Sequence, residues 1–275
     1  MSGADLEAYF ARLGYAGPAE PRLRVLQRLH ALHAEKIPFE NLSPFLGEPV
    51  RLDLESLQDK LLARGRGGWC FEQNVLFAHM LEAIGFDVLR LAARVRWNVP
   101  PERLTPRSHM LLRVRLPEGD YIADVGFGGL TLTAPLRLEA GVEQPTPHEP
   151  HRVVAIDAGF RLEARIAGEW SALYTFEMGE QQLADYEVTN WYLCNHPDSQ
   201  FVNGIIAARA EPSKRHALRG TRYAIHFPDG HTERHEIAGV QAYRELLEGP
   251  FTIRVPDAPR LDEKLAGLIE AARRS

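Results

Sequence analysis

Two hydrophobic periods divide the chain. In roughly the first 85 residues, apolar side chains recur three or four positions apart, first at Leu6, Tyr9 and Leu13 and again from Leu23 to Leu32. This spacing places them on one face of a helix. It predicts four helices, near residues 6–13, 23–32, 53–63 and 70–85, with Gly85 as the C-cap of the last one.

A strand period replaces the helical one after residue 85. The segments VLRLAARVRW, HMLLRVRL and YIADVGF alternate apolar and polar residues and are rich in β-branched side chains, which is typical of strands. The strand period therefore predicts a sheet or small barrel over residues 86–180. Beyond them, a Pro-Asp-Gly turn in TRYAIHFPDGHTERHEI predicts a hairpin, and helical patterns follow near residues 238–248 and 260–273.

These patterns together predict a multidomain α+β protein in three consecutive parts. We expect a helical part over residues 1–85, a β-barrel over residues 86–185 and a mixed α/β part over residues 186–275. A chain of 275 residues is long enough for more than one hydrophobic core. The proline-rich segment Pro145–His151 is expected to be an exposed loop.

The charge balance argues against one large class of partner. The chain has 32 Lys and Arg against 37 Asp and Glu, a net charge of −5, and its cationic residues never form a run longer than a pair. A nucleic-acid partner is therefore not expected. The sequence MSGADLEAYF lacks the pattern of a targeting segment, and no apolar run approaches the length of a membrane span. We expect a cytoplasmic protein without membrane contact, and the sequence is compatible with a homodimer.

One of the two cysteines, Cys70, directly follows the glycine-rich stretch RGRGGW. Glycine permits backbone conformations that a Cβ forbids, and a helical pattern begins at once, so Cys70 should lie at a helix N-terminus. That position stabilises a thiolate. A buried cysteine that only fills space is the alternative. Cys194, among aromatic residues with no neighbouring glycine or base, is expected to pack in the core.

Two polar residues in the predicted strands are candidate partners for Cys70. His109 begins an apolar strand, and Asp124 lies within another, where an aspartate is disfavoured unless something holds it. The short turn LPEGD should pair these strands and bring the two side chains together. Each residue alone fits a polar pair inside a sheet. Together with Cys70 they predict a Cys-His-Asp triad.

Two further patterns, a glycine-rich run and the distribution of histidines, are weaker evidence for a binding site. Gly126, Gly128 and Gly129 could let backbone N–H groups approach a phosphate, although by themselves they fit a turn at a strand end better. The histidines include His30 and His33 on one helix face and three more around the predicted hairpin, at 226, 231 and 235. No cysteine or converging acid accompanies them, so we expect surface imidazoles and no metal site.

Several of these motifs resemble those of the arylamine N-acetyltransferase family. The family's Arg-Gly-Gly-x-Cys motif corresponds to RGGWC at residues 66–70, followed by the characteristic FEQN at 71–74. PFEN at 38–41, Ser108 with His109, and ADVGFG at 123–128 fit three further motifs. The chain length also agrees from end to end, whereas the C-terminal third matches mainly by Phe201.

The resemblance implies a fold and an activity. The fold is an N-terminal helical bundle, a central β-barrel and a C-terminal α/β lid, with a cysteine-protease-like triad at the junction of the first two. The activity is acetyl-CoA-dependent N-acetylation of arylamines, arylhydrazines or hydrazides by a ping-pong mechanism through acetyl-Cys70. A possible ion pair of Arg66 with Glu40 would brace the glycine turn.

The resemblance also assigns binding residues, with acetyl-CoA as co-substrate and no metal. The residues expected at CoA are Ser108, Gly126, Phe127, Gly128 and Gly129. Those expected at the small-molecule acceptor are Phe39, Val95 and Phe201. Two other functions stay open: a cysteine hydrolase or transglutaminase-like enzyme with the same triad, and a binding module that keeps the fold without catalysis.

Overall fold

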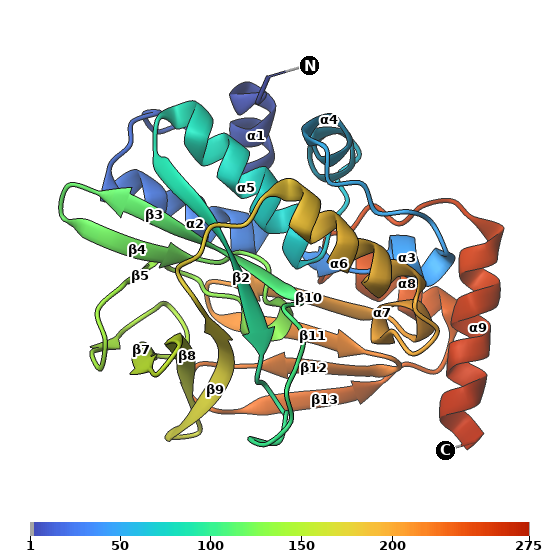
Figure 1. The fold of residues 1–275 in the computed structure, drawn as a ribbon. Coiled ribbons are helices and arrows are strands. Elements are labelled where there is room, and N and C mark those ends of the chain that lie inside the picture. Colours follow the sequence, from blue (N-terminus) through green and yellow to red (C-terminus); the bar gives the residue numbers. More distant parts are fainter. Residues whose placement is uncertain (1–2, 275) are drawn as a thin grey trace.

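The computed structural model describes residues 3–274 (Figure 1). Its N-terminal part is helical, as predicted, with α1 at Leu6–Leu13, α2 at Leu23–Lys36 and α5 at Cys70–Ile84. Helix α5 is buried along nearly its whole length, so it forms the centre of the apolar core of the N-terminal part, here called the first core, instead of covering its surface. Gly85 ends α5 in the left-handed conformation, which confirms the predicted C-cap.

The helix predicted over residues 53–63 changes its hydrogen-bond period midway. Helix α4 covers only Leu54–Leu57, and a π-helical turn continues it over Gln58–Ala63. Asp53 caps the start of α4 by accepting a hydrogen bond from the Ser56 N–H. A π-helical turn rotates the following side chains relative to an α-helix, and such turns recur at functional sites.

The central part is an antiparallel sheet of eight strands that curves into a nearly closed barrel, in the order β5-β4-β3-β2-β9-β8-β7-β6. The strands are β2 (Asp87–Val95), β3 (His109–Leu116), β4 (Gly119–Ala123), β5 (Leu136–Arg137), β6 (Glu143–Gln144), β7 (His151–Ile156), β8 (Gly159–Ile166) and β9 (Glu169–Phe176). Its inward-facing apolar side chains form a core of their own.

The C-terminal part contains a second antiparallel sheet; its last two helices pack in the core of this sheet, whereas the helix over residues 183–195 packs against the N-terminal core. Its helices are α6 (Leu183–Asn195), α7 (Gln200–Asn203), α8 (Val240–Glu248) and α9 (Pro259–Arg274), and its strands are β10 (Ile206–Glu211), β11 (Lys214–Arg219), β12 (Arg222–His226) and β13 (Thr232–Glu236). The predicted hairpin is β12 and β13, and both C-terminal helices are confirmed.

An N-terminal segment completes this second sheet. The two-residue strand β1, Phe39–Glu40, pairs with β10, opposite Ala207 and Ala208. Helix α3, Leu42–Leu46, then joins the C-terminal core. The sequence did not predict this crossing, because the hydrophobic pattern does not specify which distant strand a short segment joins. The boundaries at residues 85 and 185 stay a prediction.

Two local predictions were wrong. The segment Pro145–His151 is only partly exposed, because His148 binds the Glu211 carbonyl at 2.8 Å and the carboxylate of Glu149 forms an ion pair with Arg215 at 2.7 Å. It therefore joins the barrel to the second sheet. His30 and His33 are not surface imidazoles, because both are fully buried. Within residues 3–274, no helix has the length and apolarity needed to cross a membrane.

Candidate functional site

Cys70 is the first residue of α5 and is 7% exposed. Two glycines let the chain reach this position. A Cβ on Gly67 would lie 2.1 Å from the Pro38 carbonyl oxygen, and a Cβ on Gly68 would lie 2.7 Å from the Glu72 carboxylate. The predicted helix N-terminus is therefore confirmed, but these two glycines are required by close packing, since neither has a positive φ.

A buried ion pair braces the turn that carries Cys70. The Arg66 Nε donates to Glu40 Oε1 at 2.8 Å, and Glu40 Oε2 accepts the Leu42 N–H at 2.6 Å. Burial raises the pKa of Glu40, but the charge of Arg66 outweighs it, so the net shift is downward. Glu40 therefore stays ionised, and the expected pairing of Arg66 with Glu40 is confirmed.

His109 and Asp124 meet through the predicted hairpin. His109 is the first residue of β3, Asp124 directly follows β4, and these strands pair with Leu112 opposite Ala123. His109 Nε2 and Asp124 Oδ2 are 2.7 Å apart. His109 is 2% exposed and Asp124 is fully buried. The hydrogen bond to Asp124 leaves His109 Nδ1 as the ring nitrogen available to Cys70.

The electrostatics of this group favour a charged imidazole. Burial lowers the pKa of His109, but the charge and hydrogen bond of Asp124, together with a hydrogen bond to Cys70, raise it to about 10. Burial raises the pKa of Asp124, but His109 and the hydrogen bonds to the carboxylate outweigh it and lower the pKa. An imidazolium beside the thiol stabilises the thiolate form of Cys70.

Two side chains that the sequence did not link to Asp124 hold this residue in place. The Asn74 Nδ2 donates to Asp124 Oδ1 at 3.0 Å and to the Met110 carbonyl at 2.8 Å. The Asp124 N–H donates to His30 Nε2 at 3.1 Å, which requires a neutral imidazole. Burial lowers the pKa of His30 to about 4, consistent with that state. Asn74 could have been found from the FEQN motif, whereas His30 gave no such signal.

Aromatic rings enclose the imidazole. Phe127 and Tyr174 each place their ring centroid 5.0 Å from that of His109. The sequence did not single out Tyr174, which lies in the middle of a strand whose aromatic residues look like ordinary core. Next to Phe127, Gly126 packs directly against the nucleophile, since a Cβ there would lie 2.7 Å from the Cys70 Cα.

Two of the residues expected at the acceptor, Phe39 and Phe201, form an aromatic cluster with Trp69, the residue before Cys70. Trp69 and Phe201 have ring centroids 5.0 Å apart, and Phe39 lies 6.4 Å from Phe201. Val95 comes from the barrel, where it pairs with Tyr174. The four side chains arrive from three parts of the chain, and their apolar surfaces suit a flat ring.

A cleft of about 520 Å³ lies between the barrel and the second sheet. Phe127 and Gly129, both expected at CoA, lie in its wall together with Trp97. Cationic side chains from both sheets also line it: Arg165, Arg215 and Arg234. Ion pairs neutralise two of them, Arg215 with Glu149 and Arg165 with Glu143, which leaves Arg234 as the cation suited to a phosphate group.

The other residues expected at CoA lie elsewhere around the site. Gly128 faces the Phe39 ring, since a Cβ there would lie 3.8 Å from it, and Gly126 lies behind Cys70. The carbonyl of Ser108 is 3.8 Å from the Cys70 sulfur. Gly126 and Ser108 therefore adjoin Cys70 and Gly128 adjoins Phe39, and none of the three lines the cleft. Among residues 3–274, no three His, Cys, Asp or Glu side chains come together as metal ligands.

Comparison with known proteins agrees with this geometry. The family model described as N-acetyltransferase matches residues 22–260. The arylamine N-acetyltransferase of Mycobacterium bovis is 44% identical over 273 residues, which is 95% of this chain and 96% of that protein. The structure of the Mycobacterium marinum arylamine N-acetyltransferase has a TM-score of 0.92 at 41% identity, covering 96% of this chain and 100% of that one.

A second structure of the Mycobacterium marinum enzyme is a complex with CoA, and it matches with a TM-score of 0.92 at 40% identity over 96% of this chain and 99% of that one. Identity at this level over nearly the full length of both proteins is accompanied by the same three-part architecture. The chain therefore belongs to the arylamine N-acetyltransferase family and is an acyltransferase.

Proposed function

We propose that the chain transfers the acetyl group of acetyl-CoA to arylamines, arylhydrazines or hydrazides in two steps, through an acetyl-Cys70 intermediate. The observation that carries the proposal is the junction at Cys70: a thiol at the start of a buried helix, beside an imidazole that a buried carboxylate holds at 2.7 Å. This is the arrangement that activates a cysteine for acyl transfer.

In the first step, the Cys70 thiolate attacks the thioester carbonyl carbon. The carbon–sulfur bond to CoA breaks, and imidazolium His109 gives its proton to the departing CoA thiolate. The first N–H groups of α5 have no acceptor within the helix, so the Cys70 N–H is available to the developing oxyanion. Asp124 holds the ring in position during this transfer.

In the second step, neutral His109 removes a proton from the incoming amine as its nitrogen attacks the acetyl carbon. The bond to the Cys70 sulfur breaks and the amide leaves. Exchange of one thioester for another is nearly balanced, whereas formation of the amide is downhill, so the second step drives the cycle. The apolar surfaces of Phe39, Val95 and Phe201 would hold the aryl ring, which needs no counter-ion.

The cleft between the two sheets is the proposed site for CoA. It adjoins the triad at Phe127, whose ring contacts His109, and it extends to Arg165 and Arg234. A long thioester entering along it would present its carbonyl to Cys70 and a phosphate to Arg234, since Arg165 is paired with Glu143. The relative whose structure is a complex with CoA supports this use of the fold.

The direct test is mass spectrometry after incubation with acetyl-CoA alone. We expect the wild-type chain to gain the mass of one acetyl group on the peptide that contains Cys70, and Cys70→Ser to gain none. Cys194→Ser is the matched control, because Cys194 packs against the first core away from the triad and should leave acetylation unchanged. A Cys70→Ser variant that acetylates aniline at the wild-type rate would refute the mechanism.

Measuring the CoA released from acetyl-CoA without an acceptor separates acetyl transfer from hydrolysis. A cysteine hydrolase or transglutaminase-like enzyme with this triad would release CoA continuously without an amine. A transferase should release about one equivalent of CoA per enzyme and then release no more until an acceptor is added. We also propose a cytoplasmic location, where reducing conditions keep the Cys70 thiol free.

A further inference from the structure

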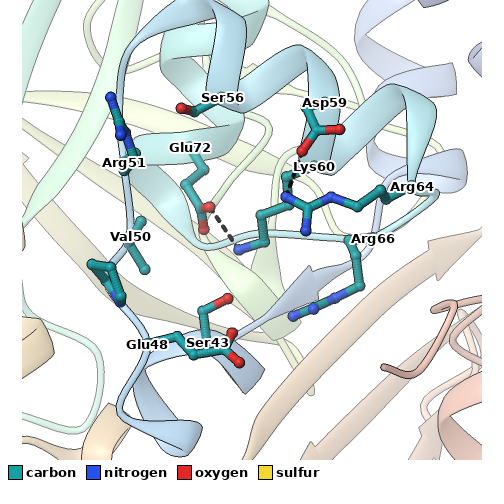
Figure 2. Close-up of a pocket in the computed structure, with 11 residues that line it drawn as sticks. Ser43, Glu48, Val50, Arg51, Ser56, Asp59, Lys60, Arg64, Arg66 and Glu72 are labelled. Atoms are coloured by element: carbon teal, nitrogen blue, oxygen red, sulfur yellow. Dashed lines mark hydrogen bonds and ion pairs between the residues drawn. The ribbon is translucent and has the colours of Figure 1, made fainter. Parts of the chain in front are cut away.

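A second cavity lies behind the nucleophile (Figure 2). It has a volume of about 320 Å³ and is bounded by the segment after α3, the π-helical turn and the first turn of α5. Its wall is mostly polar and includes Ser43, Glu48, Lys60, Arg66 and Glu72. Cys70 and Glu72 are two positions apart on α5, so Glu72 faces this cavity while Cys70 faces His109.

A buried ion pair crosses the cavity. The Lys60 Nζ lies 2.6 Å from Glu72 Oε1, and the two side chains are 11% and 2% exposed (Figure 2). Lys60 comes from the π-helical turn over Gln58–Ala63. The turn therefore places a cation where a surface helix would ordinarily bury an apolar side chain. Removing one partner of so buried a pair leaves the other charge uncompensated.

Glu72 has a second contact that leads to the nucleophile. Its Oε2 accepts the Trp69 N–H at 3.1 Å, so the carboxylate closes the turn directly before Cys70. Gly68 is required for this approach, because a Cβ there would lie 2.7 Å from Glu72 Oε2. One carboxylate thus joins Lys60, the glycine turn and the start of α5.

The charge of Glu72 acts on Cys70 in two opposite ways. As a hydrogen-bond acceptor it fixes the helix start, but as an anion in the first turn it disfavours a second negative charge on the Cys70 sulfur. The other charges near this carboxylate, Glu40 and Arg66, already form an ion pair with each other. Lys60 is the cation left to neutralise Glu72.

We propose that Lys60 is a positioning residue for the nucleophile: it neutralises Glu72, so that this carboxylate caps the helix start without opposing the Cys70 thiolate. The inference rests on the proposed role of Cys70. Lys60 touches no reacting atom and acts only through Glu72. Burial raises the pKa of Glu72, and Lys60 opposes that rise. Where Glu72 is ionised, loss of Lys60 leaves a charge that opposes the thiolate and so lowers the reactivity of Cys70.

The test compares the pH profile of Cys70 alkylation by iodoacetamide in four chains. For Lys60→Met we expect the midpoint of the profile to rise by roughly one pH unit, so that alkylation below the midpoint slows about tenfold. Acetyl-Cys70 formation should slow in parallel. Lys60→Met/Glu72→Gln should return to within about threefold of wild type, because a neutral amide caps the turn without charge.

Arg51→Met is the matched control. Arg51 lines the same cavity, but its ion pair with Asp53 is exposed, with side chains 71% and 45% accessible. We expect its profile to equal that of wild type. Circular dichroism and the melting temperature show whether each chain is folded. If Lys60→Met does not fold, Lys60→Arg replaces it. Because arginine keeps the cation, the alkylation profile of Lys60→Arg should match that of wild type.

Two outcomes would overturn the proposal. One is a folded Lys60→Met chain with the wild-type profile. The other is a double variant as unreactive as Lys60→Met, since it would show that loss of packing and not the charge of Glu72 is responsible. Alkylation needs no acetyl-CoA, so a failure of the proposed acetyl transfer would leave this test unaffected.

Discussion

At the scale of single residues, the site depends on buried charges that are each matched by a partner. His109 with Asp124, Arg66 with Glu40 and Lys60 with Glu72 are three ion pairs around one thiol. A buried charge without a partner is costly, so each pair holds its two elements at a fixed distance. The sequence indicated the first two pairs, whereas the third needed the π-helical turn to be seen.

The His109–Asp124 pair predicts a pH dependence of stability. The pKa of His109 is raised to about 10, so the pair's contribution is complete below the unfolded value of 6.5 and is lost as the pH rises toward 10. The pKa of Asp124 is lowered, so its contribution is present above 3.8 and is lost as the pH falls below that value.

We therefore expect Asp124→Asn to melt below wild type by the largest margin between about pH 4 and 6.5, by roughly 5 °C or more. The margin should shrink steadily toward pH 10. Thermal denaturation followed by circular dichroism across this range measures it, with Asp229→Asn in the exposed hairpin turn as the control. A margin that is constant with pH would show that the pair is not charged in the folded protein.

At the scale of elements, the site is made by close approach of a helix to a loop. The loop after β4 passes directly over the start of α5, and Gly126 is the contact point. Pattern analysis could predict the helix, the hairpin and the glycine loop separately, because each follows from local spacing. It could not predict that Gly126 touches Cys70, since that distance depends on how the barrel is placed against the bundle.

Gly126→Ala should therefore damage catalysis more than folding. The new Cβ would lie 2.7 Å from the Cys70 Cα and 3.0 Å from the Asn74 amide nitrogen, so one of them must shift. Misplacement of a reacting group by about 1 Å costs about a hundredfold in rate. We expect that loss in acetyl-Cys70 formation, measured by stopped-flow release of CoA.

Gly179→Ala serves as the control for this substitution, because a Cβ at Gly179 meets nothing within 4 Å. It should leave the rate of acetyl-Cys70 formation within about twofold of wild type, as for other surface changes. Equal rates for Gly126→Ala and wild type would contradict the close packing of the loop on α5.

At the scale of the whole molecule, the three parts are tied together near the site. Asn41, directly after β1, donates to the carbonyls of Phe201 and Gly204 at 2.8 and 2.7 Å and accepts the Ile206 N–H at 2.7 Å. One N-terminal side chain thereby positions the C-terminal segment that carries Phe201. The proposed acceptor surface is thus assembled from distant parts of the chain.

Asn41→Ala should weaken this connection in two measurable ways. The lost hydrogen bonds, with buried partners left unpaired, should cost about 2 kcal/mol and lower the melting temperature by about 4–8 °C. Displacement of Phe201 should raise KM for an arylamine more than it lowers the rate of acetyl-Cys70 formation. Asn195→Ala is the control, because it removes one exposed hydrogen bond within α6 and should change neither the melting temperature nor KM. Equal KM values for Asn41→Ala and wild type would show that Asn41 does not position Phe201.

The sequence by itself determined the main helices and strands, and it marked Cys70, His109 and Asp124 as the candidate catalytic residues. Helical and strand periods are local, and so are the glycines before Cys70 and the short turn that brings His109 to Asp124; each follows from a few neighbouring residues. The tertiary structure decided what is contributed from a distance. His30 reaches Asp124 over 94 positions and Asn41 reaches Ile206 over 165. Such partners leave no local pattern, because only the packing of whole parts against one another brings them together.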